Sequence, residues 1–477
     1  MSAAPAGGSS RQLDPPPPRI GPTGRAVLAA AGALSGLSRR AGMGSGSVIG
    51  GQLAVFVHRR LLTQLTTGRN VALVSGTNGK TTTNHFLARA LATRGPVATN
   101  ADGANMDAGM VVALGAEPTA ANAALECDEL WMPQVLAQVG AAVVVLLNLS
   151  RDQLDRTQEV RSIADGWRTM LAELPTRAVV ANADDPLVVW AASGAASAGH
   201  HGASLVVWVG TGTWWTLDAT GCPACAGRIT FATDAQATNA QATNTQATNT
   251  QATDGMPQWQ CSSCDFARPQ PHLWLDGDRL HTADGSVIDV PLALPGRANR
   301  ANAAMAAAAA ELFGVDPVTA VAAMADVGDV AGRYRTETVD GQPVRLLLAK
   351  NPAGWQEALE MVGDSSAPAV VSINARIADG RDPSWLWDVP FERLQGRFVV
   401  AAGERRHDLA VRLAYAEVEH ACAQSLSDAV AQVRAHQQTH RHDAGNPPGA
   451  TGDNVEPTID VIGNYTALQD YRIEVDR

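Results

Sequence analysis

A glycine-rich segment followed by a lysine and three threonines is the part of the chain whose residue types point most directly to chemistry. It reads Gly76-Thr77-Asn78-Gly79-Lys80-Thr81-Thr82-Thr83. Glycines let backbone N–H groups wrap phosphate oxygens, Lys80 can reach terminal phosphates, and the hydroxyl of Thr81 can ligate Mg²⁺. A tight turn that merely caps a helix would need neither the lysine nor the threonines. We therefore predict that residues 76–82 bind the phosphates of a nucleoside triphosphate.

The elements on either side of this segment indicate how it is held. An apolar run at 71–76 precedes it and an amphipathic pattern at 81–94 follows it. The segment 141–150 is too apolar to be solvated on either face, as in a strand of a parallel sheet. Such strands alternating with helices favour a parallel sheet covered by helices. The predicted fold class is therefore α/β, with the phosphate loop between a strand and a helix.

Two cysteine pairs, at 222–225 and 261–264, have the CxxC…CxxC spacing of a four-thiolate zinc ribbon. The 35 residues between them include a twenty-residue polar repeat at 235–254, and the remaining 15 are an ordinary ribbon spacing. Disulfides are the rival interpretation, but they rarely persist in the reducing compartment where an ATP-using enzyme works. We predict structural Zn²⁺, because four thiolates leave no open coordination position. Four cysteines are its expected ligands: Cys222, Cys225, Cys261 and Cys264.

The two remaining cysteines, Cys127 and Cys422, are expected to be unpaired buried thiols. The repeat at 235–254 has no apolar face, so we expect a flexible loop there. The stretch from His436 to Asn454 is polar, and we expect a surface loop. Pro, Gly and Ser dominate residues 1 to about 24, which suggests a disordered tail.

A shift in composition near residue 332 suggests a domain boundary, because new strand patterns (VRLLLA, AVVSIN, RFVVAA) follow it. The predicted division is a disordered or helical extension at 1–43, an ATP-binding domain at 44–332 with a ribbon insertion at about 206–290, and a smaller α/β domain at 333–477.

The composition narrows the class of partner. The formal net charge is -11 and the lysines and arginines are scattered, which argues against a nucleic-acid partner. The apolar stretch from Val27 to Leu37 is shorter than the ~20 residues that a membrane span needs, and no clear signal-peptide cleavage site follows it. We expect a cytoplasmic protein.

The loop departs from the general P-loop pattern, because the position five before Gly79 is Val74 and not glycine. This shorter GTNGKT form resembles that of the Mur ligases and folylpolyglutamate synthases. Further segments match in the same order: TNADGANMDAGM (99–110), LECDE (125–129), LNLSRDQLDR (147–156), NADDP (182–186) and LPGRANRANAA (294–304). The resemblance implies a Mur-ligase-type ATPase domain that uses ATP and Mg²⁺.

The resemblance also implies roles for single residues. Glu126 in LECDE matches the acidic residue that holds Mg²⁺ together with Thr81, and it would act with Lys80 in catalysis. Asn299 and Asn302 match paired asparagines near the nucleotide base. Arg333 matches the arginine at the start of the C-terminal domain.

The C-terminal half narrows the family. The segments at 346–355, 372–392, 403–418 and 464–468, together with the ribbon, resemble the MurT branch, the ligase subunits of lipid II isoglutaminyl synthases. The resemblance runs from about residue 45 to 470. It implies that ATP phosphorylates the D-glutamate α-carboxylate of the lipid II stem peptide, and that ammonia then converts the acyl phosphate to D-isoglutamine. Ammonia would come from a separate glutaminase subunit, GatD, in a heterodimer at the inner face of the plasma membrane.

The branch also implies that the C-terminal domain lends the glutaminase an aspartate that orients its catalytic histidine. The candidates are Asp379, Asp382 and Asp388, of which we favour Asp382. A turn acid that caps a helix is the alternative for each. Branch members usually carry Asn-Asp-Asn where this chain has Asn374-Ala375-Arg376, so the contacts at this point stay open.

Two other functions stay open. One is a stand-alone ligase that joins an amino acid to a UDP-linked peptide or a folate, which the AKNPAGW segment at 349–355 speaks against. The other is a non-catalytic ATP-binding scaffold that activates a glutaminase, which the presence of Lys80 and Glu126 speaks against.

Overall fold

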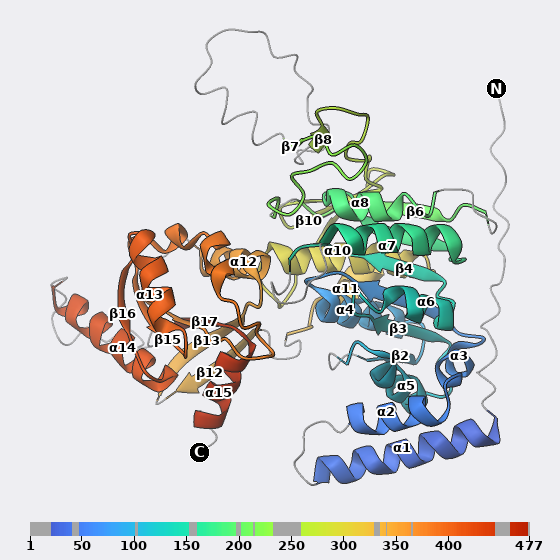
Figure 1. Ribbon diagram of the computed structural model, residues 1–477, viewed down its shortest axis with the longest axis horizontal. Coiled ribbons are helices and arrows are strands. Elements are labelled where there is room, and N and C mark those ends of the chain that lie inside the picture. Colours follow the sequence, from blue (N-terminus) through green and yellow to red (C-terminus); the bar gives the residue numbers. More distant parts are fainter. Residues whose placement is uncertain are drawn as a thin grey trace, which may run out of the picture.

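The computed structural model contains two α/β domains, each built on its own sheet (Figure 1). The tail at 1–20, the polar repeat at 235–254 and Arg333, for which the sequence makes predictions, lie outside the described residues. The structure describes residues 21–40, 47–100, 104–151, 160–196, 202–212, 215–231, 259–328, 334–339, 341–363, 366–443 and 458–475.

The first domain is built on a nine-stranded sheet of order β11-β10-β9-β6-β5-β4-β1-β3-β2. The strands from β2 to β9 in that order run parallel, and β10 and β11 complete the edge as an antiparallel hairpin. The strands are β1 (Asn70–Ser75), β2 (Val97–Thr99), β3 (Asn122–Glu126), β4 (Val143–Leu146), β5 (Ala178–Asn182), β6 (Leu205–Gly210), β9 (Leu273–Asp276), β10 (Arg279–Thr282) and β11 (Val287–Asp289).

Helices cover both faces of this sheet, which explains why its central strands are continuous apolar runs. In β4, Val144 and Leu146 belong to the core on one face, and Val143 and Val145 to the core on the other. One core is completed by α3 (Leu61–Thr66), α5 (Asp107–Ala116), α6 (Met132–Val139), α7 (Val160–Glu173) and α8 (Pro186–Ala192). The other is completed by α4 (Lys80–Ala92), α10 (Arg297–Glu311) and α11 (Pro317–Met324).

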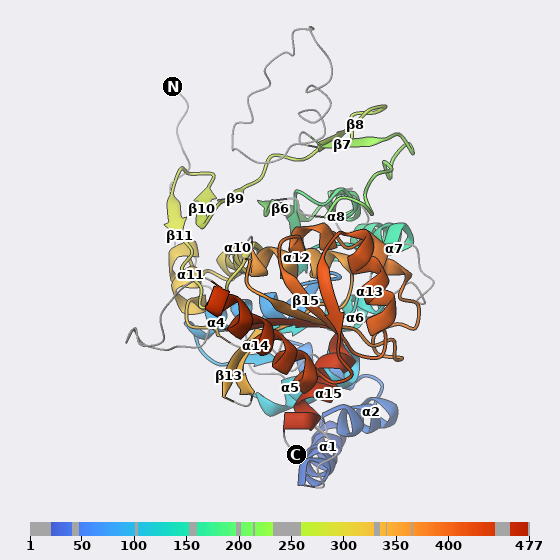
Figure 2. The ribbon, with the colours of Figure 1, turned by 90° about the vertical axis from the view of Figure 1, so that its left-hand side faces the viewer.

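The first two helices of the described chain, α1 (Pro22–Arg40) and α2 (Ser47–Val57), lie below α5 in Figure 1. At the opposite end a small two-stranded sheet, β7 (Ile229–Phe231) and β8 (Trp259–Cys261), projects from the domain. Figure 2, turned by 90°, places these two features at opposite ends as well. Among the described helices, none is long and apolar enough to cross a membrane.

The second domain is a six-stranded sheet of order β12-β13-β17-β14-β15-β16, parallel from β13 to β16, with helices on both faces. Its strands are β12 (Tyr334–Val339), β13 (Gln342–Leu348), β14 (Ala369–Ser372), β15 (Phe398–Ala402), β16 (Glu419–Cys422) and β17 (Ile459–Gly463). Its helices are α12 (Pro352–Val362), α13 (Arg406–Tyr415), α14 (Leu426–Asp443), α15 (Tyr465–Val475) and two 3₁₀ turns, η1 (Ser384–Asp388) and η2 (Phe391–Leu394).

The α/β class and the parallel sheets confirm the sequence prediction, and two details are wrong. The predicted loop from His436 to Asn454 begins in a helix, because α14 continues to Asp443 and the His436 ring stacks on Phe398 with centroids 4.1 Å apart. Residues 444–454 lie outside the described part of the chain. Cys422 is exposed and not buried, because it lies at the end of the edge strand β16. Cys127 is buried as expected.

The strand order determines where a ligand site can form. From β1 the chain proceeds to β2 and β3 on one side and then to β4 on the other, so the loops after β1, β3 and β4 meet at one edge of the sheet. Ligands of open α/β sheets bind at such a switch point, outside the carboxyl ends of the strands.

Candidate active site

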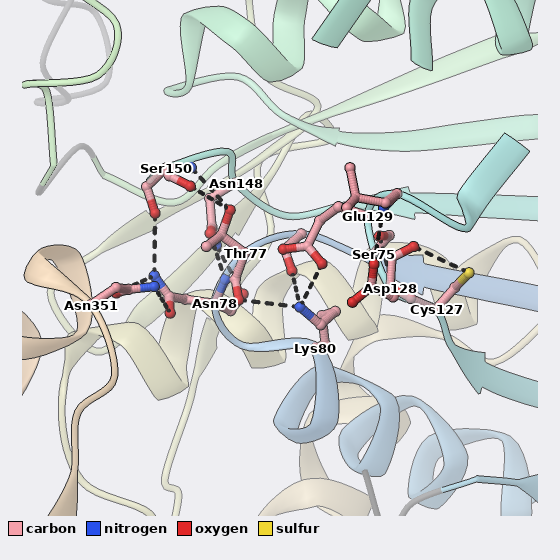
Figure 3. Close-up of polar contacts among 12 residues, drawn as sticks. Ser75, Thr77, Asn78, Lys80, Cys127, Asp128, Glu129, Asn148, Ser150 and Asn351 are labelled. Atoms are coloured by element: carbon pink, nitrogen blue, oxygen red, sulfur yellow. Dashed lines mark hydrogen bonds and ion pairs between the residues drawn. The ribbon is translucent and has the colours of Figure 1, made fainter. Parts of the chain in front are cut away.

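The loop between β1 and α4 is held by hydrogen bonds to the loop that follows β4. The Asn78 backbone N–H donates to Asn148 Oδ1 at 2.9 Å, and Asn148 Nδ2 donates to the Asn78 carbonyl at 3.0 Å. Ser150 N–H donates to Thr77 Oγ1 at 3.0 Å. Figure 3 shows these contacts. These hydrogen bonds therefore hold the loop in one shape.

Gly79 has a backbone that only glycine adopts easily, with φ of +84°, and it immediately precedes α4. A Cβ at this position would overlap Oδ1 of Asn302, which reaches the loop from α10. Asn302, predicted to lie near the nucleotide base, thus has its amide against the phosphate loop. Its predicted partner Asn299 is buried in the first turns of the same helix, where its Nδ2 donates to the Pro295 carbonyl at 2.6 Å.

Lys80 is folded back over the loop that it follows. Its Nζ donates to the Gly76 carbonyl at 2.7 Å and to Glu129 Oε2 at 3.0 Å, and both side chains are about nine-tenths buried (Figure 3). Burial raises the pKa of Glu129, and the charge of Lys80 opposes that rise. The lysine is thus held at the loop by a buried ion pair.

Glu126 lies where the sequence analysis expects an acidic group, at the carboxyl end of β3 and paired in register with Val74 of β1. It is almost fully buried, and its backbone N–H donates to Asn100 Oδ1 at 2.8 Å. The carboxylate that contacts Lys80 belongs, however, to Glu129, three residues on. Sequence reasoning overlooked Glu129, although it lies within the same LECDE segment.

Helix α4 begins at Lys80, and the two threonines that come directly after it, Thr81 and Thr82, are buried in its first turn. Their hydroxyls therefore lie in the first turn, beside the loop. A helix N-terminus carries unsatisfied N–H groups and a partial positive charge, which suit a phosphate.

The second domain contacts this loop directly. Asn78 and Asn351 exchange two amide hydrogen bonds, Nδ2 to Oδ1, at 3.3 and 3.1 Å. Asn351 is buried, and its Oδ1 also accepts from Gly354 N–H at 2.9 Å, so it caps α12. The asparagine of the AKNPAGW segment therefore couples the start of α12 to the phosphate loop.

A cavity of about 230 Å³ lies close by, between the start of α10 and helix α12 of the other domain. Both charge signs contribute to its wall, because arginines come from α10 and glutamates from α12. The lining residues are Gly296, Arg297, Ala298, Arg300, Glu357, Glu360 and Met361.

The three candidate aspartates of the C-terminal domain differ in their surroundings. Asp379 is buried and accepts from both the N–H and the hydroxyl of Thr466 at the start of α15. Asp388 forms an ion pair with Arg151 at 3.3 Å. Asp382 is exposed and accepts from Ser384 N–H at 2.9 Å. Asp379 is therefore held inside the domain by its bonds to α15, whereas Asp382 faces solvent.

The segment that departs from the branch pattern forms its own network. Arg376 contacts Glu404 at 2.9 Å and Asp470 at 2.6 Å, and these hydrogen bonds raise the pKa of the arginine, the bond to Asp470 most of all. Asn374 Nδ2 also donates to Asp470 at 3.0 Å. The arginine thus links the loops after β14 and β15 to helix α15.

The four ribbon cysteines gather at one point. Their sulfur atoms all lie within 4.8 Å of one another, with Cys222 and Cys264 at 3.7 Å and Cys225 and Cys261 at 3.5 Å. These distances are too long for a disulfide, and they match the sulfur spacing of about 3.8 Å expected around a tetrahedral ion with Zn–S bonds of about 2.3 Å. Backbone N–H groups of Ala224, Gly227 and Ser263 point at three of the sulfurs, at 3.3 to 3.4 Å. The residues therefore fit Zn²⁺.

The ribbon is fastened to the first domain by the NADDP segment. Asp184 and Arg268 form an ion pair at 2.6 Å, and each side chain is 1% exposed. Trp259 Nε1 donates to the Ala183 carbonyl at 3.1 Å. Asp185 caps α8 and accepts from Leu149 N–H at 2.8 Å, and burial raises its pKa to about 6. NADDP is thus a bracing segment between the ribbon and the loop after β4.

Comparison with known proteins agrees with this geometry. The family described as Mur ligase middle domain matches residues 74–209, and MurT ligase C-terminal matches residues 348–468. A Streptococcus pneumoniae protein named lipid II isoglutaminyl synthase (glutamine-hydrolyzing) subunit MurT is 28% identical over 386 residues, which cover 78% of this chain and 82% of that protein.

Solved structures share the fold at low identity. MurF from Acinetobacter baumannii aligns with a TM-score of 0.60 and 14% identity over 89% of this chain and 80% of that one. Mycobacterium tuberculosis folylpolyglutamate synthase complexed with ADP aligns with a TM-score of 0.55 and 15% identity over 96% of both chains. The chain thus carries a Mur ligase middle domain around the phosphate loop and a MurT ligase C-terminal domain after it, and over 78% of its length it is similar to MurT subunits of lipid II isoglutaminyl synthase.

Proposed function

We propose that this chain is the ATP-dependent ligase subunit of a lipid II isoglutaminyl synthase. The observation that carries the proposal is the pair of hydrogen bonds between Asn78 and Asn351. It joins the phosphate loop of a Mur-type ATPase domain to the domain that distinguishes the MurT branch. The substrate is the D-glutamate α-carboxylate of the lipid II stem peptide, at the inner face of the plasma membrane.

The reaction has two steps. A carboxylate oxygen attacks the γ-phosphorus of ATP and ADP leaves, which gives an acyl phosphate. Ammonia then attacks the carbonyl carbon, phosphate leaves, and the product is D-isoglutamine. Activation is needed because a carboxylate is a poor electrophile, and phosphate converts its oxygen into a good leaving group.

The residues of the loop supply phosphate binding and charge. Residues Gly76 to Thr82 would hold the phosphates through backbone N–H groups, and Lys80 would exchange Glu129 for the terminal phosphates. Magnesium, when bound, neutralises charge between ATP and the substrate carboxylate. Thr81 and Glu126 are its proposed ligands, with Glu129 as a further oxygen donor. Asn299, Asn302 and Arg333 complete the proposed nucleotide site.

Ammonia would come from a GatD-type glutaminase bound to the C-terminal domain. Asp382 lies in a region where large apolar side chains are also exposed, namely Ile377, Trp387 and Tyr415. Trp387 and Tyr415 contact each other edge to face at 5.3 Å. An exposed aromatic pair of this kind is typical of a protein interface. The ribbon cysteines would hold a structural Zn²⁺ ion.

Replacing Asp382 should separate the two half-reactions. In Asp382→Asn the amide oxygen still accepts from Ser384 N–H, so only the charge is lost. We expect glutamine-dependent amidation to fall about 10²- to 10⁴-fold, as when a triad aspartate loses its charge. Amidation with added ammonium chloride should be unchanged. Equal activity with glutamine would exclude Asp382 as the orienting acid, and Asp388→Asn is the next variant to assay.

The contact between the two domains makes a second prediction. Asn351→Ala removes the bonds to Asn78 and a helix cap, so the KM for ATP should rise about tenfold or more. Asp316→Ala is the matched control, because Asp316 caps α11 by accepting a hydrogen bond from Thr319 N–H. Aspartate and asparagine caps stabilise a helix by similar amounts. Both variants should lose about 1 kcal/mol of stability. A similar KM in the two variants would show that the inter-domain contact has no role in ATP binding.

The function is tested by measuring ADP release from the full chain. It should require lipid II together with ammonium chloride, or glutamine and the glutaminase subunit. Free amino acids should not replace ammonia. ADP release that depends on an amino acid would favour a stand-alone ligase, and none under any condition would favour a scaffold.

A further inference from the structure

The outer face of α2 is apolar where a surface helix should be polar. Leu53, Phe56 and Val57 are 42, 81 and 58% exposed, and they lie on one side of the helix. The helix sequence, SVIGGQLAVFV, contains no charged residue. A helix that is apolar all round is normally buried on all sides. The outer face of α2 therefore lacks the polar residues expected on a helix face that contacts only water.

The opposite face of α2 fixes the helix to the domain. A Cβ on Gly51 would overlap the backbone oxygen of Ala108 in α5, and Ala54 is fully buried. The neighbouring helix α1 contacts α5 as well, through Leu28 packed on Gly115. Close packing of small residues holds α2 in place, so the exposed side chains are presented outward on a firm support.

The chain segment that contains this face carries charge of one sign, although Asp107 and Glu117 at the two ends of the neighbouring helix α5 are acidic. Residues 21–69 include six arginines and no aspartate or glutamate, in a chain whose net charge is -11. Arg59 and Arg60 follow α2 directly and are exposed, as is Arg25 on α1. Arg69 points inward and donates to the Leu114 carbonyl. The segment that carries the apolar face is thus basic, although the whole protein is acidic.

We infer that the outer face of α2, with the exposed Arg25 of α1 and the exposed Arg59 and Arg60 of the turn after α2, docks on an anionic lipid bilayer. Helices that lie in a membrane interface combine an apolar face with flanking Lys or Arg, which pair with anionic headgroups. The negative charge elsewhere on the protein would be repelled, which orients this end toward the lipid.

The docking surface deepens the proposed function and rests on it, because a lipid-linked substrate must be met at the bilayer. Figures 1 and 2 show α1 and α2 at one end of the first domain and the zinc ribbon at the other. With α2 on the bilayer, the ribbon would project into solution.

The test is co-sedimentation of the full chain, alone and with its glutaminase, with vesicles of two compositions. The chain should bind vesicles of equal parts phosphatidylcholine and phosphatidylglycerol, weakly bind phosphatidylcholine alone, and be released by salt. Phe56→Ser and Arg59→Glu should each weaken binding about tenfold. Their matched controls are Val318→Ser and Arg279→Glu, exposed residues far from α2, which should bind as the unaltered chain does.

Amidation assays separate this inference from the proposed function. Phe56→Ser should act normally on a detergent-soluble lipid II analogue with a short chain and more slowly on lipid II in vesicles. Absence of amidation of both by the unaltered chain would refute the function and not the docking. Normal vesicle binding by Phe56→Ser would refute the docking surface. If this variant binds vesicles normally and instead loses its association with the glutaminase, the outer face of α2 binds protein and not lipid.

Discussion

Lys80→Met should lower ATP-dependent amidation about a thousandfold while the chain still folds. Methionine keeps the length and volume of the side chain but cannot stabilise charge on the transferred phosphoryl group, and losing one such donor typically costs about 10²- to 10³-fold in kcat. The variant should also bind ATP more weakly. Amidation above a tenth of the unaltered rate would contradict the role assigned to this lysine.

The ion pair with Glu129 complicates a single substitution and also supplies the control. Removing Lys80 leaves a buried carboxylate without its cation, which raises the pKa of Glu129 further and destabilises the fold. In the double variant Lys80→Met/Glu129→Gln that buried charge is absent. We expect its melting temperature to recover while amidation stays low, which separates loss of chemistry from loss of stability.

Two single substitutions of the acidic residues test which of them holds magnesium. Glu126→Gln and Glu129→Gln should each be assayed over a range of Mg²⁺ concentrations. If Glu126 is the ligand, as the family resemblance implies, its variant should need more Mg²⁺ for half-maximal activity. A shift confined to Glu129→Gln would assign the metal to the residue that sequence reasoning overlooked.

Cys261→Ser should remove the zinc and unfold the ribbon. Structural zinc contributes about 10–16 kcal/mol of apparent binding energy in small zinc-binding peptides, which is more than two short strands can replace. Zinc content should fall from one ion per chain to nearly none, and proteolysis should cut between β7 and β8 faster. ATP-dependent activity should fall less than in Lys80→Met, because the cluster lies away from the loop.

Cys422→Ser is the matched control for the ribbon, because Cys422 is an exposed thiol outside the cluster. It should keep its zinc and its resistance to protease. Absence of zinc from the unaltered chain, or intact disulfides in it after purification without reductant, would contradict the zinc assignment.

Much of this site could be predicted from sequence because its elements are local. The phosphate loop, the apolar strand before it and the helix after it are adjacent in the chain, and so are the members of each cysteine pair. The continuous apolar composition of β4 indicated burial on both faces. Residues 436–443 were misjudged because a polar composition suits an exposed helix as well as a loop, and the exposure of Cys422 depends on β16 being an edge strand.

Contacts between distant segments could not be predicted. Asn78 and Asn351 are 273 residues apart, and nothing in either segment alone indicates that they pair. The ion pair between Lys80 and Glu129 depends on how the chain turns after β3. Asp379 reads as a candidate beside Asp382, and only its bonds to Thr466, 87 residues away, reveal its structural surroundings.

The most direct test of the proposed function is the mass of the product. The full chain, the glutaminase subunit, ATP, glutamine and lipid II should be incubated together, and the stem peptide analysed by fragmentation mass spectrometry. We predict that the α-carboxylate of D-glutamate becomes an amide, with one ADP formed per amide and no product from Lys80→Met. Unchanged lipid II, or addition of an amino acid in place of ammonia, would contradict it.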